Sequence, residues 1–300
     1  MRTRKVIDSH VHLWDLESNY YPWLMDGLSG EEGKSGLESI AHTYLIDHLV
    51  EHSDEVDLEG IVHIQADYDP SDPVGETRWL DTYANEGRLK GIDLAIIGFV
   101  DLTAPNAECL LEQHCHSRYF RGIRQMLNFV DNPRYCWASQ DYLANPQWRQ
   151  NFSLLSKYQL SFDLMCFDQQ MEEASRLAAQ HADVPIILEH CGMPWLGEEH
   201  DTLWRKGIEA LARCDNVACK LGGLGTMQPN WQYQDAQKYF DHLLHHFGVE
   251  RLMYATNFPT DSVFTSYQQV IRSFSHAMSQ LSADEQDQIF RLNARNWYRL

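Results

Sequence analysis

Segments with strand character alternate with helical segments along this chain of 300 residues. Strands are expected at residues 6–14, 60–66, 91–100, 120–126, 160–165, 184–190, 217–221 and 251–257. Helices are expected at residues 44–53, 73–86, 104–116, 145–158, 170–182, 202–214, 236–247, 267–281 and 283–294. Strands that alternate with helices predict right-handed crossovers and a parallel sheet. Eight such units favour closure into a single (β/α)8 barrel, and no glycine-rich phosphate loop of a doubly wound sheet follows the first strand.

The length of the chain is compatible with one domain over residues 1–300, because barrels of this class commonly contain about 250 residues. An irregular insert follows the first strand. It is aromatic at residues 20–24 and glycine-rich at residues 27–36. Because large aromatic side chains favour burial, we expect the insert to cover the mouth of the barrel as a loop rather than to act as a linker.

The charge and the cysteine content limit which partners the protein can bind and indicate the compartment in which it is expected. The formal net charge of −19 disfavours nucleic acids and anionic membranes as partners. No apolar run approaches the ~20 residues of a membrane span, and residues 1–5 lead into the first strand without the apolar region of a signal peptide. Seven cysteines without a CxxC pair fit reduced thiols. We therefore expect a cytoplasmic protein that acts on a small molecule, with homo-oligomerisation left open.

The first strand contains two histidines that are two residues apart. Because side chains alternate between the faces of a strand, Val6, Asp8, His10 and His12 are expected on one face. Barrel active sites lie at the carboxyl ends of the strands, where two imidazoles can bind a metal or hydrogen-bond a substrate oxygen. Other polar residues near predicted strand ends are Gln65, Arg124, His190, Lys220 and Asn257.

Six motifs near these strand ends resemble those of the amidohydrolase superfamily. They are residues 8–15 (DSHVHLWD), 62–66 (VHIQA), 121–125 (RGIRQ), 188–194 (LEHCGMP), 220–224 (KLGGL) and 255–259 (ATNFP). The chain is most similar to the metal-dependent hydrolase group that includes sugar lactonases and 2-pyrone-4,6-dicarboxylate lactonase. The resemblance implies a hydrolase of a small cyclic carboxylic ester, such as a sugar-acid lactone.

The same resemblance implies roles for the residues at the strand ends. His10, His12 and His190 would stabilise the oxyanion that forms when water attacks the carbonyl. They would do so by holding one divalent metal, zinc or manganese, or without a metal by hydrogen bonding, and both alternatives remain open. Contacts with the substrate would come from Gln65, Arg124, Lys220, Asn257 and Asp163.

The sequence departs from the family at strand eight. Most members have an aspartate that binds or deprotonates the attacking water, whereas this chain has Asn257. Because an amide cannot act as a general base near neutral pH, another carboxylate must accept the proton. Asp261 is the first candidate, followed by Asp163 and Glu189.

Two further functions fit the same pattern. Asn257 could mark a change of reaction, so that the site isomerises a lactone or decarboxylates an acid. It could also mark the loss of catalysis in a barrel that only binds a ligand. The other site-like residues favour an enzyme over the binding role.

Overall fold

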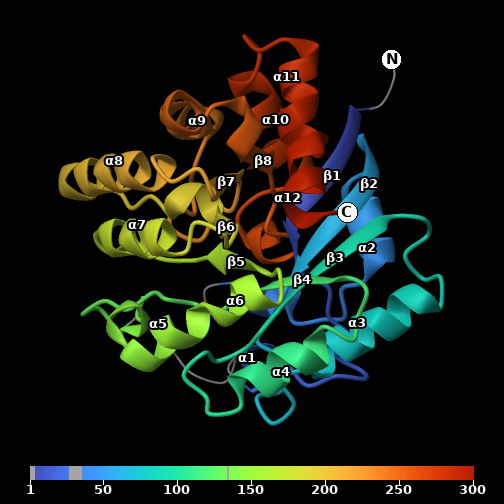
Figure 1. Ribbon diagram of the computed structural model, residues 1–300. Coiled ribbons are helices and arrows are strands. Elements are labelled where there is room, and N and C mark those ends of the chain that lie inside the picture. Colours follow the sequence, from blue (N-terminus) through green and yellow to red (C-terminus); the bar gives the residue numbers. More distant parts are fainter. Residues whose placement is uncertain (1–3, 27–35, 134) are drawn as a thin grey trace.

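The computed structural model describes residues 4–26, 36–133 and 135–300. Its eight strands form one sheet in sequence order, and each neighbouring pair is parallel (Figure 1). The strands are β1 (Arg4–Val11), β2 (Val56–Ile64), β3 (Asp93–Gly98), β4 (Phe120–Arg124), β5 (Ser161–Leu164), β6 (Ile186–Leu188), β7 (Val217–Leu221) and β8 (Leu252–Tyr254). This order confirms the predicted (β/α)8 barrel.

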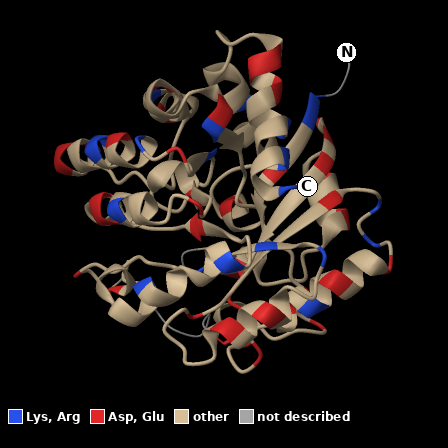
Figure 2. Cartoon of the chain, in the orientation of Figure 1, with Lys and Arg blue, Asp and Glu red and all other residues tan. Residues whose placement is uncertain are grey.

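Helices occupy the connections and surround the strands (Figure 1). The α-helices are α1 (Pro22–Met25), α2 (Ile46–His52), α3 (Gly75–Asn85), α4 (Ala107–His114), α5 (Pro146–Phe152), α6 (Leu154–Lys157), α7 (Met171–Gln180), α8 (Glu198–Ala212), α9 (Tyr233–Phe247), α10 (Tyr267–Ala277), α11 (Ala283–Asp287) and α12 (Asn293–Tyr298). None of the helices in the described ranges has the length and apolar character that crossing a membrane requires. Figure 2 shows acidic and basic residues interspersed along outer helices such as α7 and α8.

The barrel closes through the segment that follows β8. The backbone N–H of His12 donates to the carbonyl of Phe258 (2.8 Å), and the N–H of Asn257 donates to the carbonyl of His10 (2.9 Å). The Asp8 carboxylate accepts hydrogen bonds from the backbone N–H (3.0 Å) and the hydroxyl (2.6 Å) of Thr256. These contacts join the first strand to the end of the last strand, where we expect the site.

Two hydrophobic cores hold the barrel. The larger one lies between the strands and the helices and includes Val6, Val11 and Leu13. The smaller one is formed by side chains from alternating strand positions together with two residues of α12. Its buried members are Ile7, Val62, Ile64, Ala95, Ile97, Ile187, Ala218, Met253, Ala294 and Tyr298.

The prediction of which side chains share a face of the first strand is partly wrong. Val6 packs in the core between the sheet and the helices, whereas Ile7 packs in the smaller core, the reverse of the simple alternation. The pairing of β1 with β2 shifts register between Asp8 and Val11. Such an irregularity re-aims the side chains that follow it. The side chains of His10 and His12 therefore contact each other, whereas the Asp8 side chain binds Thr256.

Two expected helices are interrupted. Residues 145–158 form α5 and α6, with a break at Ser153, whose hydroxyl donates to the carbonyl of Gln150 (2.7 Å). Such a local bond competes with regular helix formation. Residues 283–294 contain a π-helical turn, η8 (Gln288–Leu292), between α11 and α12. The aromatic part of the insert forms α1, and its glycine-rich part, residues 27–35, lies outside the described residues.

Candidate active site

The structure gathers the predicted histidines and their polar companions at the carboxyl ends of the strands. His10 belongs to β1, and His12 follows that strand directly. Arg124 ends β4, Lys220 belongs to β7, and His190 begins η5 (His190–Gly192) after β6. All of the predicted site residues are at most 5% exposed: His10, His12, Gln65, Arg124, Asp163, His190, Lys220, Asn257 and Asp261.

His12 has a defined tautomer. Its Nδ1 lies 2.7 Å from the carbonyl oxygen of Ile64, and because a carbonyl can only accept, Nδ1 carries the hydrogen. The lone pair of Nε2 is then left to face His10 Nε2 (3.3 Å) and the Oδ1 of Asn257 (3.2 Å). Burial lowers the pKa of both His10 and His12 well below the usual value, so both imidazoles are neutral near pH 7.

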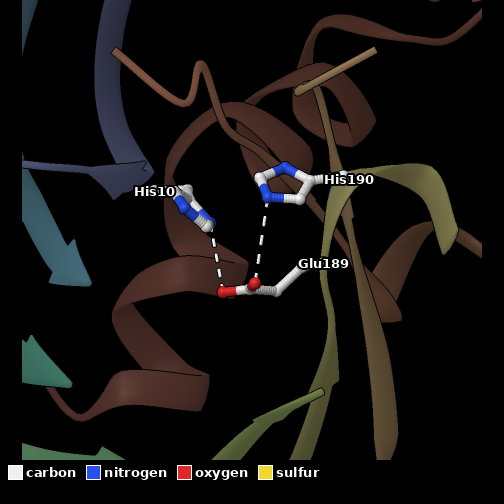
Figure 3. A group of neighbouring side chains, drawn as sticks. All are labelled: His10, Glu189 and His190. Carbon is white, nitrogen blue, oxygen red and sulfur yellow. Dashed lines mark ion pairs between the residues drawn. The ribbon is translucent and has the colours of Figure 1, made fainter. Parts of the chain in front are cut away.

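Glu189 lies between the histidines and two cationic side chains. Its Oε1 is 3.3 Å from His10 Nδ1 and 3.7 Å from Lys220 Nζ. Its Oε2 is 3.6 Å from Arg124 NH1 and 3.8 Å from His190 Nε2. Figure 3 shows both imidazoles directed toward the carboxylate. Although Glu189 is fully buried, neither of its oxygens has a hydrogen-bond partner.

Lys220 forms a buried ion pair with Asp163. Its ammonium group donates to Asp163 Oδ2, which also accepts the hydroxyl hydrogen of Tyr298 from α12 (2.7 Å). The same ammonium group lies 3.3 Å from His10 Nδ1. The predicted residue Asp163 therefore contacts Lys220 rather than the histidines.

Asn257 separates Asp261 from the histidines. The amide Nδ2 of Asn257 donates to Asp261 Oδ1 (2.9 Å), and the backbone N–H of Gly225 donates to Asp261 Oδ2 (3.3 Å). These bonds fix the amide so that its Oδ1 faces His12. Burial raises the pKa of Asp261 to about 7. The carboxylate that we predicted as the general base thus orients Asn257, and it is Asn257 that contacts His12.

Arg124 and Gln65 bring hydrogen-bond donors to the site. The NH2 group of Arg124 donates to the backbone carbonyl of Gln65 (2.5 Å), while its Nε has no partner. The side-chain Oε1 of Gln65 accepts the N–H of Asp67 (2.7 Å), which leaves the buried Nε2 without a partner. Unpaired buried donors are costly, so these two groups are suited to bind oxygens of a ligand.

The donor set fits a divalent metal ion. One ligand atom from each of His10, Glu189 and His190 lies within 4.8 Å of the others. His12 Nε2 is 3.3 Å from His10 Nε2, which is close to the spacing of two nitrogens on one ion with bonds of about 2.0–2.1 Å. The bond from His12 Nδ1 to the Ile64 carbonyl is of the kind that orients metal-binding histidines. The buried Glu189 oxygens, which accept no hydrogen bond, also favour a cation here.

Among the candidate bases predicted from the sequence, Glu189 ranked below Asp261 and Asp163. Neighbouring residues on a strand point to opposite faces, so His190 on the inner face would direct Glu189 outward. However, β6 ends at Leu188, and the backbone of His190 is left-handed, with a φ of 54°. Both side chains therefore reach the site. Gly223 makes room for His190, because a Cβ atom there would lie 1.9 Å from His190 Nδ1.

The loops after β4, β5, β6 and β7 contribute an apolar cap. Met165, Phe167 and Met193 form its buried centre, and the sulfur of Met165 lies 3.9 Å from Arg124 NH1. Half-buried side chains around them are Met126, Val130, Tyr135, Trp137, Trp195 and Met227. The cap shields the Arg124 side of the site from water.

This barrel and its histidine-rich mouth define an amidohydrolase. The family model described as Amidohydrolase matches residues 7–300, and the chain belongs to this family.

Curated relatives extend over almost the whole chain. The uncharacterized protein y4mH of Sinorhizobium fredii is 38% identical over 296 residues, which are 98% of each chain. An L-fucono-1,5-lactonase of Burkholderia multivorans is 28% identical over 311 residues, covering 98% of this chain and 96% of that protein. A zinc-bound amidohydrolase structure from Burkholderia multivorans has a TM-score of 0.78 at 25% identity, covering 98% of this chain and 99% of its own.

Asp261 should make the protein less stable as the pH rises from about 4 toward neutrality. Burial raises its pKa from 3.8 to about 7, so the folded chain binds this proton more tightly than the unfolded chain does. The resulting stabilisation is complete below pH 3.8 and is lost as the pH approaches about 7. Its size is about 1.4 kcal/mol per unit of pKa difference. Asp261→Asn removes the ionisation.

We therefore expect the free energy of unfolding of Asp261→Asn to decrease less between about pH 5 and pH 8 than that of the wild type. Urea titrations of both proteins at several pH values measure this difference. Equal pH dependence of the two proteins would contradict the assignment.

Proposed function

We propose that this protein hydrolyses a small cyclic carboxylic ester, most specifically a sugar-acid lactone. The observation that carries the proposal is the convergence of three buried imidazoles with the Glu189 carboxylate, whose oxygens accept no hydrogen bond. Arg124 and Lys220 provide positive charge beside the same carboxylate. The similarity to proteins named L-fucono-1,5-lactonase supports the choice of a lactone.

In the proposed reaction, the oxygen of water attacks the ester carbonyl and the ring C–O bond breaks to give a hydroxy acid. The free donors of Arg124 and Gln65 bind substrate oxygens, and the imidazoles stabilise the developing oxyanion. Glu189 accepts the proton of the water, and the released ring oxygen gains a proton. We prefer Glu189 to Asp261 as the base because its oxygens accept no hydrogen bond and one lies 3.3 Å from His10 Nδ1, whereas both oxygens of Asp261 accept hydrogen bonds.

We further propose that His10, His12 and His190 hold one zinc or manganese ion. Glu189 has an oxygen within 4.8 Å of ligand atoms of His10 and His190, and His12 Nε2 lies 3.3 Å from His10 Nε2. A bound divalent ion would polarise the carbonyl and lower the pKa of a water molecule. In that case Arg124 and Gln65 would still bind substrate oxygens, and Lys220 would still lie beside Glu189. The zinc-bound relative supports this part of the proposal.

Turnover of a panel of aldonolactones, followed by NMR of the products, tests the proposed reaction. Ring-opened hydroxy acids are expected. A rearranged lactone or released carbon dioxide would instead support isomerisation or decarboxylation at the same site. If the wild type turns over no lactone, ester or amide while Asn257→Asp does, the role of a ligand-binding barrel is favoured.

Removal of the metal should abolish most of this activity. We expect protein purified without a histidine tag to contain about one zinc or manganese ion per chain, as measured by elemental analysis. Dialysis against a chelator should lower kcat, and adding back the ion should restore it. Full activity in metal-free protein would instead favour hydrogen bonding by the neutral histidines.

The remaining features fit an enzyme of small metabolites. All seven cysteines are free, which supports a reducing compartment such as the cytoplasm. Basic residues on α7 and α8 pair with neighbouring acidic residues, for example Arg176 with Glu172 and Arg205 with Asp201. This arrangement and the net charge of −19 support a small molecule rather than nucleic acid as the partner.

A further inference from the structure

A cavity of about 240 Å³ adjoins the site on the side of β2 and β3. Its link to the site is Gln65, whose backbone carbonyl accepts from Arg124 (2.5 Å) and whose side chain lines the cavity. It reaches the surface, because Asp67 and Pro70 in its wall are exposed. The lining residues are Pro22, Trp23, Gln65, Asp67, Tyr68, Asp69, Pro70, Pro73, Glu76 and Phe99.

Flat apolar side chains form much of its wall. Trp23 is anchored from behind, because its indole N–H donates to the carbonyl of Ala66 (2.7 Å) and its ring packs edge-on against Trp14 (5.7 Å between centroids). Tyr68 packs edge-on against Tyr21 (5.3 Å). These contacts hold the rings in place before a ligand arrives, which reduces the entropic cost of binding.

The polar groups of the cavity define which ligand it can accept. The Nε2 of Gln65 is buried, has no partner and belongs to a residue that lines the cavity. Three carboxyl side chains also line it, Asp67, Asp69 and Glu76, and none of its described lining residues is Lys or Arg. A ligand group here therefore needs an oxygen to accept from Gln65, and it meets repulsion if it carries a negative charge.

We propose that this cavity is a subsite for a neutral ring that carries hydroxyl groups, such as a pyranose. The rings of Trp23 and Tyr68 provide surfaces for its apolar face, Gln65 donates to one of its oxygens, and the carboxylates accept from its hydroxyl groups. The volume suits a single ring, because it is smaller than the roughly 300–1,000 Å³ of drug-sized sites. On the proposed function, the lactone substrate would carry this ring as a second sugar joined to the lactone, because the one ring of a simple aldonolactone contains the ester itself.

Binding of methyl β-D-glucopyranoside tests the subsite without any hydrolysis. In titrations followed by saturation-transfer NMR, we expect the wild type to bind this glycoside and Trp23→Ala to weaken binding at least tenfold. Trp23→Phe keeps an aromatic wall and should retain most of the affinity. Gln65→Met removes the proposed hydrogen bond to the ligand, together with the one from the Asp67 N–H, at similar size, and should weaken binding by about threefold to tenfold. D-glucuronate should bind the wild type more weakly than the glycoside.

The matched control is Trp79→Ala, which removes a half-buried tryptophan of α3 that does not line the cavity. Its affinity for the glycoside should equal that of the wild type. Equal binding by wild type and Trp23→Ala, or binding of glucuronate as tight as that of the glycoside, would overturn the subsite. Because these measurements need no turnover, they can fail while lactone hydrolysis succeeds, and the reverse.

Discussion

Replacing His12 and His190 together with alanine is expected to reduce kcat/KM for aldonolactones at least about a thousandfold, because stabilisation of a developing oxyanion commonly contributes about 10²–10³ per donor. Both residues are at most 5% exposed, and each contacts the cluster around His10 and Glu189. The double variant also removes two of the three proposed metal ligands. Initial rates on the aldonolactone panel measure the effect.

The control for this double variant is His245→Ala with His246→Ala on the outer helix α9. Its activity should match that of the wild type. Circular dichroism and the unfolding temperature show whether each variant is folded. Full activity in a folded His12 and His190 double variant would disprove the assignment of the site, whatever the substrate.

Lys220→Ala is expected to lower the free energy of unfolding by about 3–5 kcal/mol, the usual cost of removing one partner of a buried ion pair. Lys220 is fully buried and donates to Asp163, and it also lies 3.7 Å from Glu189. Without the ammonium group, two buried carboxylates lose a neighbouring positive charge. Urea or thermal unfolding measures the loss.

A second substitution separates charge from packing. Lys220→Met combined with Asp163→Asn removes both charges at similar volume, so we expect the pair to recover a large part of the stability that Lys220→Ala loses. Lys206→Ala, at an exposed position of α8, should change stability by less than about 0.5 kcal/mol. If Lys220→Ala is as stable as Lys206→Ala, the buried ion pair does not contribute as proposed.

The fold was predictable from the sequence because the two patterns that indicate it can each be recognised in short segments of the chain. Strand and helix segments alternate, and polar residues follow the strands, so the barrel and the grouping of His10, His12 and His190 could be expected before the structure. The match to the amidohydrolase family confirms the resemblance that the motifs suggested.

The finer geometry of the site depends on contacts that sequence periodicity does not contain. The register shift in β1 separates Asp8 from His10, and the left-handed backbone at His190 brings Glu189 inward. The contact of Tyr298 with Asp163 joins residues that are 135 positions apart. The apolar cap also comes from four separate loops, so no single segment of sequence indicates it.

The closure of the barrel also has a consequence for biosynthesis. Asp8 and its partner Thr256 are 248 residues apart, and His10 bonds the backbone of Asn257 beside it. During translation, β1 therefore leaves the ribosome long before the segment that pairs with its free edge has been synthesised. During that interval the nascent β1 carries an unpaired, apolar edge, a state that favours aggregation. We expect the yield of native enzyme to depend on how this early segment is protected while translation continues.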